Sequence, residues 1–154
     1  MSSARGLANH SLYMAKLLLE AWSDAEAAAP TRQQALNAAF APALRNHLLD
    51  AYGWFLLALM RQTKLPGAPP HCTAQLPQRG PGIAEPGEID EYRQAEQQGW
   101  LAGLQKPLPK GLPPARRNNM LAVTGTYPGY NDYREYCSTL DALFQRMADS
   151  VDEH

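Results

Sequence analysis

Hydrophobic residues recur at helical spacing in a long segment near the start of the chain. The apolar positions share one helical face: Leu12, Ala15, Leu18, Leu19 and Trp22. This period is typical of an amphipathic helix, and Pro30 ends it because proline cannot continue a helix. The pattern predicts a helix over about residues 8–29.

A second apolar stripe runs from Leu36 to Leu59 and predicts a helix over about residues 32–64. Residues 51–60 hold no charge and, apart from Gly53, are entirely apolar or aromatic. A helix that is apolar on nearly all sides must be covered on most of them. We therefore expect this segment to form the centre of a small helical domain.

Pro42 lies inside the second predicted helix and removes one backbone donor. We expect a kink or a break between Ala38 and Pro42. The connection between the two helices is short, which favours an antiparallel hairpin over about residues 8–64.

Proline and glycine divide the remainder of the chain. Most of the 13 prolines lie between Pro66 and Pro128. We predict a Pro/Gly-rich first strap over residues 65–87 and a second strap over 106–130. Between and after them, helical patterns predict a third helix over about 88–105, with Gly99 as the candidate point of division, and a C-terminal helix over about 131–150.

These elements predict one all-α domain over residues 1–154. Its architecture is an up-down helical bundle of about four helices with long Pro-rich connecting straps. Apolar residues make up 45% of the chain, enough for a real core, and the net charge of −1 argues against a dominant electrostatic partner.

The cysteines and the apolar segments bear on location. Cys72 and Cys137 are the two cysteines, and two free thiols in a reducing cytosol is the favoured interpretation. The apolar run over residues 51–60 is too short to span a bilayer, which takes about 20 residues. We expect a cytoplasmic protein with no membrane partner.

Three polar residues precede the apolar run: Arg45, His47 and Asp50. His47 and Asp50 are three positions apart, so they are neighbours on a helix face. A carboxylate can orient an imidazole for general-base catalysis or metal binding. The alternative is a polar layer whose groups are all hydrogen-bonded. Paired Glu-x-x-His motifs, typical of di-metal bundles, are absent, so these three remain weak catalytic candidates and no metal site is predicted.

The segment RGLANH places Arg5 and His10 at an Arg-x4-His spacing. This resembles the short Arg/His signature of helical ribonucleases of toxin and defence systems. A two-residue pattern is a weak match, and we expect it to lie in a frayed N-terminus.

The second strap combines basic and aromatic residues that are candidates for partner binding: Lys106, Lys110, Arg116, Arg117, Tyr127 and Tyr130. Such a mixture can bind single-stranded nucleic acid through phosphates and stacking. Trp100, beside Gly99, is the candidate interface anchor, and packing into the core is the alternative for it.

Several segments together resemble an uncharacterised family of short all-helical proteins of pseudomonads and related gamma-proteobacteria. They are LYMAKLLLEAW, HLLDAYGWFLLALMRQTKLP, GWLAGL and LDALFQRMADSVDEH. The resemblance implies a bacterial cytosolic helical protein and implies no activity, because none is assigned to that family.

The sequence carries no nucleophile elbow, no phosphate-binding loop and no HExxH motif. We therefore predict a non-catalytic cytosolic adaptor or regulatory module, without a cofactor, that binds a protein partner or a second copy of itself. Two alternatives stay open: a protein acting on RNA or single-stranded nucleic acid through the basic strap, and a helical bundle that binds a small ligand or a metal.

Overall fold

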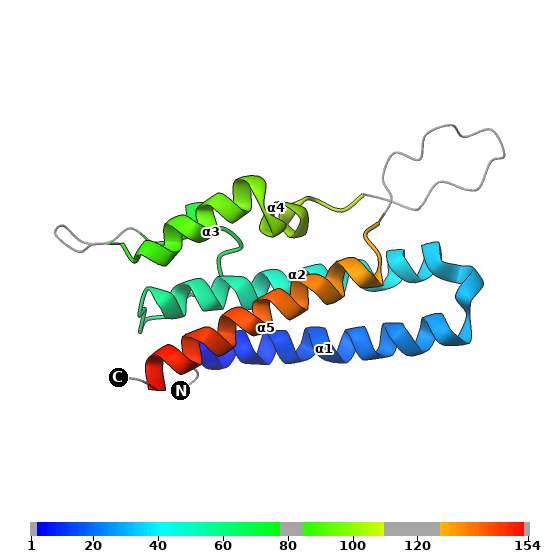
Figure 1. Cartoon of the computed structure of the whole chain (residues 1–154), viewed down its shortest axis with the longest axis horizontal. Helices are drawn as coiled ribbons and strands as arrows, with labels where there is room; N and C mark the ends of the chain where they lie inside the picture. The colour runs from blue at the N-terminus through cyan, green and yellow to red at the C-terminus, as the bar shows by residue number, and fades with distance from the viewer. Residues whose placement is uncertain (1–2, 78–84, 110–126, 153–154) are drawn as a thin grey trace.

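The computed structural model describes residues 3–77, 85–109 and 127–152, and within these ranges it contains helices, turns and loops but no strand (Figure 1). The predicted all-α class is therefore confirmed for the described residues. The described residues form five α-helices: α1 (Ala4–Ala28), α2 (Gln33–Leu59), α3 (Gly87–Gln98), α4 (Trp100–Gln105) and α5 (Tyr130–Asp152). Short 3-10 turns span Pro30–Arg32 and Thr73–Gln75. None of the described helices is long and apolar enough to cross a membrane.

Helix α1 begins four residues earlier than the apolar pattern indicates. Ser3 precedes its first turn, and the Ser3 side-chain oxygen accepts a hydrogen bond from the Gly6 N–H at 2.9 Å. This N-cap satisfies one of the free backbone donors at the helix start. Arg5 and His10 consequently lie within a capped helix, and the expectation of a frayed N-terminus for them is wrong.

Helix α2 continues through Pro42 without a break. Proline costs the helix one hydrogen bond, and burial offsets this cost because Ala41 and Leu44 beside it are fully buried. Of the two outcomes expected at Pro42, the break is therefore wrong.

Helix α2 ends at Leu59 rather than at residue 64, because Arg61 adopts a left-handed conformation with a φ of 55°. The Arg61 N–H donates to the Ala58 carbonyl, and the Gln62 N–H donates to the Leu57 carbonyl, each at 3.1 Å. These two bonds form a Schellman motif, in which glycine is the usual residue at the left-handed position. An L side chain there costs roughly 1–2 kcal/mol.

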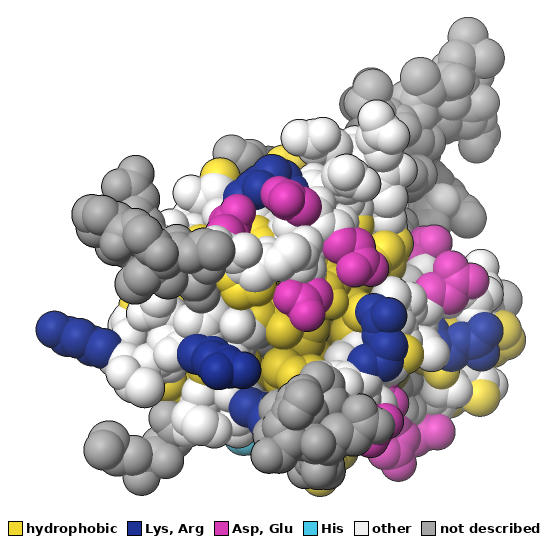
Figure 2. Space-filling model, turned by 60° about the vertical axis from the view of Figure 1, so that its left-hand side comes forward, with side chains coloured by type: hydrophobic (Ala, Val, Ile, Leu, Met, Phe, Trp, Pro, Cys, Tyr) yellow, Lys and Arg dark blue, Asp and Glu magenta, His cyan; other side chains and the backbone are white. Residues whose placement is uncertain are grey.

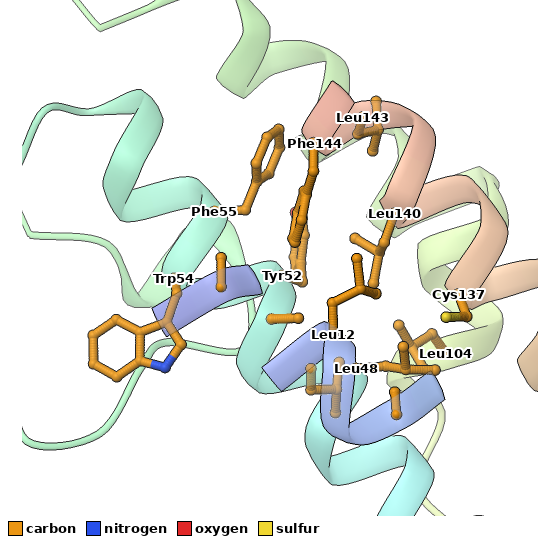
Figure 3. Close-up of a cluster of buried hydrophobic side chains, with 14 of the residues drawn as sticks. Leu12, Leu48, Tyr52, Trp54, Phe55, Leu104, Cys137, Leu140, Leu143 and Phe144 are labelled. Atoms are coloured by element: carbon orange, nitrogen blue, oxygen red, sulfur yellow. The ribbon is translucent and has the colours of Figure 1, made fainter. Parts of the chain in front are cut away.

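Helices α1 and α2 form an antiparallel pair, and α5 lies along both of them. The start of α1 and the end of α5 lie at the same end of the molecule (Figure 1). Phe55 of α2 stacks on Phe144 of α5, with ring centroids 5.0 Å apart (Figure 3). At the other end of the pair, Trp22 stacks on Phe40 at 5.3 Å and meets Tyr130 edge-on. Aromatic pairs such as these add about 0.5–1.5 kcal/mol each beyond the burial of their area.

Helices α3 and α4 lie on the side of α2 that faces away from α1 (Figure 1). They are separated at Gly99, which has extended backbone and lies between the two elements. Tyr92 of α3 packs edge-on against Tyr52 and Phe55 of α2, with centroids 6.3 and 5.5 Å apart. Leu101 and Leu104 of α4 are buried in the same core.

The described part of the first strap, residues 65–77, returns along α2 and makes a very close backbone contact with it. A Cβ atom placed on Gly53 would lie 1.7 Å from the Pro70 carbonyl oxygen. Pro70 is itself buried. Gly53 therefore interrupts the apolar run of α2 because only glycine lets the strap approach this closely.

Gly53→Ala should lower the free energy of unfolding by about 2 kcal/mol. The new methyl group must push the Pro70 backbone away, and this cost exceeds the gain of about 1 kcal/mol in helix propensity. Urea unfolding followed by circular dichroism measures the change. Gly67→Ala is the matched control, because nothing lies within 4 Å of its new methyl, and it should change stability by less than about 0.5 kcal/mol. A Gly53→Ala protein as stable as the wild type would contradict the close contact.

Candidate functional site

Arg45, the first of the three polar residues before the apolar run, caps helix α4. Its Nη2 donates to the Gln105 carbonyl oxygen at 2.9 Å, and its Nε donates to the Lys106 carbonyl oxygen at 3.2 Å. Carbonyls at the C-terminal end of a helix have no partner within the helix. A cation at that end also interacts favourably with the negative end of the helix dipole. The Arg45 guanidinium is thus used in joining α2 to α4.

Asp50 pairs with a histidine of the first strap. Its Oδ1 lies 2.8 Å from Nε2 of His71, and both side chains are partly exposed. His47 lies half-buried on the same helix, but His71 is the imidazole that contacts Asp50. The structure therefore places Arg45 and Asp50 in two different contacts rather than in one site with His47.

Glu96 of α3 is the centre of a polar layer between α2, the first strap and α4. Both of its carboxylate oxygens accept from the Thr73 N–H at 3.0 Å. One also accepts from the Tyr52 hydroxyl at 3.2 Å, and the other from Gln105 Nε2 at 3.2 Å. Gln105 Nε2 further donates to the His71 carbonyl oxygen at 2.8 Å. We call this set Asp50, Tyr52, His71, Thr73, Glu96 and Gln105 the Glu96 layer.

The chemistry of the Glu96 layer is that of a structural network. Burial, reinforced by the negative charge of Glu96, holds the pKa of Tyr52 well above its usual range, so the phenol stays protonated and donates. The Glu96 carboxylate is occupied by three donors, and the His71 imidazole is engaged by Asp50. Among the residues that the structure describes, no three His, Cys, Asp or Glu side chains are arranged to hold a metal ion.

Apart from the Glu96 layer, the structure has a groove of about 650 Å³ at the end of the molecule where α1 begins and α5 ends (Figure 2). It lies between the end of α2, the start of α3 and the second half of α5, and we call it the α2–α3–α5 groove. Its residues are Phe55, Ala58, Leu59, Arg61, Pro86, Glu88, Glu91, Tyr92, Leu143, Arg146 and Met147. In Figure 2 apolar side chains form its centre, with acidic and basic side chains around them.

Charges of both signs stand at the groove. Glu88 and Glu91 belong to α3, Arg146 belongs to α5, and Arg61 follows α2; all four are exposed. Burial raises the pKa of Tyr92 in the groove floor, with a further rise from Glu91, while the nearby Arg146 opposes the shift. The sequence patterns did not reveal this groove, because it is created by the packing of three helices that are distant along the chain.

Three of the residues predicted to bind a partner lie close together near the start of α5: Trp100 contacts Tyr136, and Tyr136 lines the same hollow as Lys106 and Tyr127. Trp100 is half-buried and contacts Tyr136 with centroids 6.5 Å apart. Lys106 and Tyr127 line a second hollow of about 550 Å³ between α4 and the start of α5. The Tyr127 hydroxyl donates to the Pro109 carbonyl oxygen at 3.2 Å.

Tyr130 also has an internal contact, because it packs edge-on against the buried Trp22, and the Arg134 guanidinium lies 5.9 Å from its ring centroid. The other three predicted residues, Lys110, Arg116 and Arg117, lie outside the described residues.

Arg5 and His10 both lie on α1, but they are five positions apart and so project about 140° from each other around the helix axis. Arg5 is half-buried and His10 is exposed. The ribonuclease interpretation of this pair stays a prediction.

Comparison of the chain with protein-family models, curated proteins and solved structures gives no match. The resemblance to short helical proteins of pseudomonads therefore stays a prediction.

Glu96→Ala should lower the free energy of unfolding by about 2–3 kcal/mol, because it leaves the Thr73 N–H and the Tyr52 hydroxyl without their acceptor. It should also loosen the strap, so that the half-buried Cys72 is alkylated faster in the native protein. Burial raises the pKa of the Cys137 thiol, which keeps the background reaction slow. Urea unfolding and mass spectrometry after iodoacetamide treatment measure the two effects.

Glu135→Ala is the matched control for this experiment, since Glu135 is exposed on α5. It should leave stability within about 0.5 kcal/mol and leave Cys72 alkylation unchanged. An unchanged alkylation rate in Glu96→Ala would show that the layer does not hold the strap.

Proposed function

We propose that the protein is a non-catalytic adaptor or regulatory module, and that it binds a protein partner in the α2–α3–α5 groove. The observation that carries this proposal is the groove itself: an open, apolar-floored hollow with exposed charges of both signs at its margin. Protein interfaces combine an apolar centre with a polar rim in this way.

The Glu96 layer supports a non-catalytic role. Its carboxylates, imidazole and phenol hold the first strap, α3 and α4 against α2. A general base or nucleophile has to reach a substrate proton or a reacting atom. The groups of the Glu96 layer are instead bonded to one another and to the backbone.

The balance of charge at the groove favours a protein over nucleic acid as partner. Two acidic and two basic side chains stand there, whereas a nucleic-acid site is a basic surface that neutralises phosphates. The basic second strap and Trp100 stay predicted partner-binding features.

The wider setting is part of the same proposal. We propose a single domain, an up-down bundle whose two Pro-rich straps connect its helices, acting in the cytoplasm of a bacterium. The packing of α1, α2 and α5 side by side supports the bundle. The family resemblance supports the bacterial setting.

A photo-crosslinking residue placed at Glu91, on the groove margin, should give a covalent adduct of one defined mass in cells that express the protein. The same residue at Leu17, an exposed apolar position of α1, should give none. The adduct at position 91 should disappear when Met147→Glu places a charge in the groove, and it should persist when Leu17→Glu places the same charge on α1.

Circular dichroism verifies that both glutamate variants are folded. Failure to crosslink at position 91, or equal crosslinking at positions 17 and 91, would contradict the proposal.

A further inference from the structure

The floor of the α2–α3–α5 groove is apolar, and its half-buried residues Ala58, Leu59 and Met147 offer the surface against which a row of apolar side chains can pack. Phe55, Tyr92 and Leu143 are buried beneath them. A helix presents such a row at positions i, i+3, i+4 and i+7.

The charges at the groove are segregated by helix. Glu88 and Glu91 are three positions apart on α3, so they lie on one face of that helix. Arg146 on α5 and Arg61 after α2 belong to the other two walls. The groove thus has one acidic wall and a basic side formed by the other two helices.

Arg61 adds an independent observation. It holds the left-handed position of the Schellman motif, where glycine fits without strain, and its side chain lines the groove. Backbone strain of this kind clusters at binding sites, where it is retained for what the side chain does. The described non-glycine residue with a positive φ therefore lies at the groove to which we assign partner binding.

We propose that the partner element is an amphipathic helix with acidic side chains along one edge of its apolar face and basic side chains along the other. This inference rests on the function proposed above. The acidic edge meets Arg61 and Arg146, and the basic edge meets Glu88 and Glu91. Arg61 is the specificity-determining residue of the site.

Two other occupants fit the groove less well. A second copy of the protein that presents the same groove would place two concave surfaces against each other and leave the apolar floor uncovered. An anionic small molecule would meet Glu88 and Glu91 as well as the two arginines, and like charges at close range repel it. A convex helix with edges of opposite charge satisfies both walls at once.

Three synthetic helical peptides of about 16 residues, with the same leucine stripe, test the inference. One has glutamates on one edge and lysines on the other, one has glutamates on both, and one has lysines on both. The mixed peptide should bind about tenfold more tightly than either uniform peptide at low salt, and its advantage should shrink at 0.5 M NaCl, about a 4 Å Debye length. If the mixed peptide turns end for end in the groove, its acidic and basic edges change places. One of its two binding directions therefore always pairs each edge with the wall of opposite charge.

Glu88→Lys together with Glu91→Lys makes both walls basic and should make the all-glutamate peptide the tightest binder. Glu20→Lys with Asp24→Lys makes the same change of charge on exposed positions of α1, and should leave the order of the peptides unchanged. Arg61→Gly should weaken the mixed peptide and reduce its advantage, while raising the urea midpoint because strain is removed.

Equal affinities for the three peptides, no binding by any of them, or an unchanged order in the double lysine variant would overturn the inference. If position 91 crosslinks a partner but the peptides show no preference, the adaptor function survives and the charge-paired helix does not. If the mixed peptide is preferred but position 91 crosslinks nothing in cells, the groove chemistry survives and the proposed function fails.

Discussion

The rest of the structure depends on how the first strap packs between α2 on one side and α3 and α4 on the other. On one side the Pro70 carbonyl lies against Gly53, where no Cβ intervenes. On the other, the Thr73 N–H is held by both oxygens of Glu96. The strap thereby links the buried centre of α2 to α3, and it fixes where α3 stands. Since the acidic wall of the groove is carried by α3, the geometry of the proposed binding surface follows from this contact.

The end of α2 shows how stability and binding oppose each other in this molecule. Arg61 occupies a position at which an L side chain is strained, and the Schellman hydrogen bonds around it still form. Glycine would end the helix with less strain but would remove a cation from the groove. The protein therefore carries a local cost of stability at the surface to which we assign its function, as is common at sites that bind other molecules.

Hydrophobic periodicity predicted the all-α class, because α1, α2 and α5 each bury a stripe against the same core. It could not place the start of α1, since the Ser3 cap acts through one polar side chain outside the apolar pattern. The prediction of a helix break at Pro42 was wrong because tertiary packing can outweigh the loss of one backbone hydrogen bond.

The site was harder to predict for a related reason. Helical spacing predicted that Asp50 would pair with His47 on the same helix. Asp50 instead contacts His71, which lies 21 positions away in a Pro-rich loop. Gly53 is the exception in the apolar run. The reason for a glycine there is the close approach of the Pro70 carbonyl, which lies in another part of the chain. The groove depends on three helix ends meeting in space, which no local pattern encodes.

Amide hydrogen exchange at Thr73, followed by NMR, tests most directly whether the strap is locked into the fold. We expect the Thr73 N–H to exchange nearly as slowly as the buried amides of α2, because its hydrogen bond to Glu96 opens only when the strap leaves its seat. The N–H of Gly67, exposed in the same strap, should exchange quickly. A Thr73 amide that exchanges as fast as that of Gly67 would contradict the central claim that this contact positions α3 and the groove.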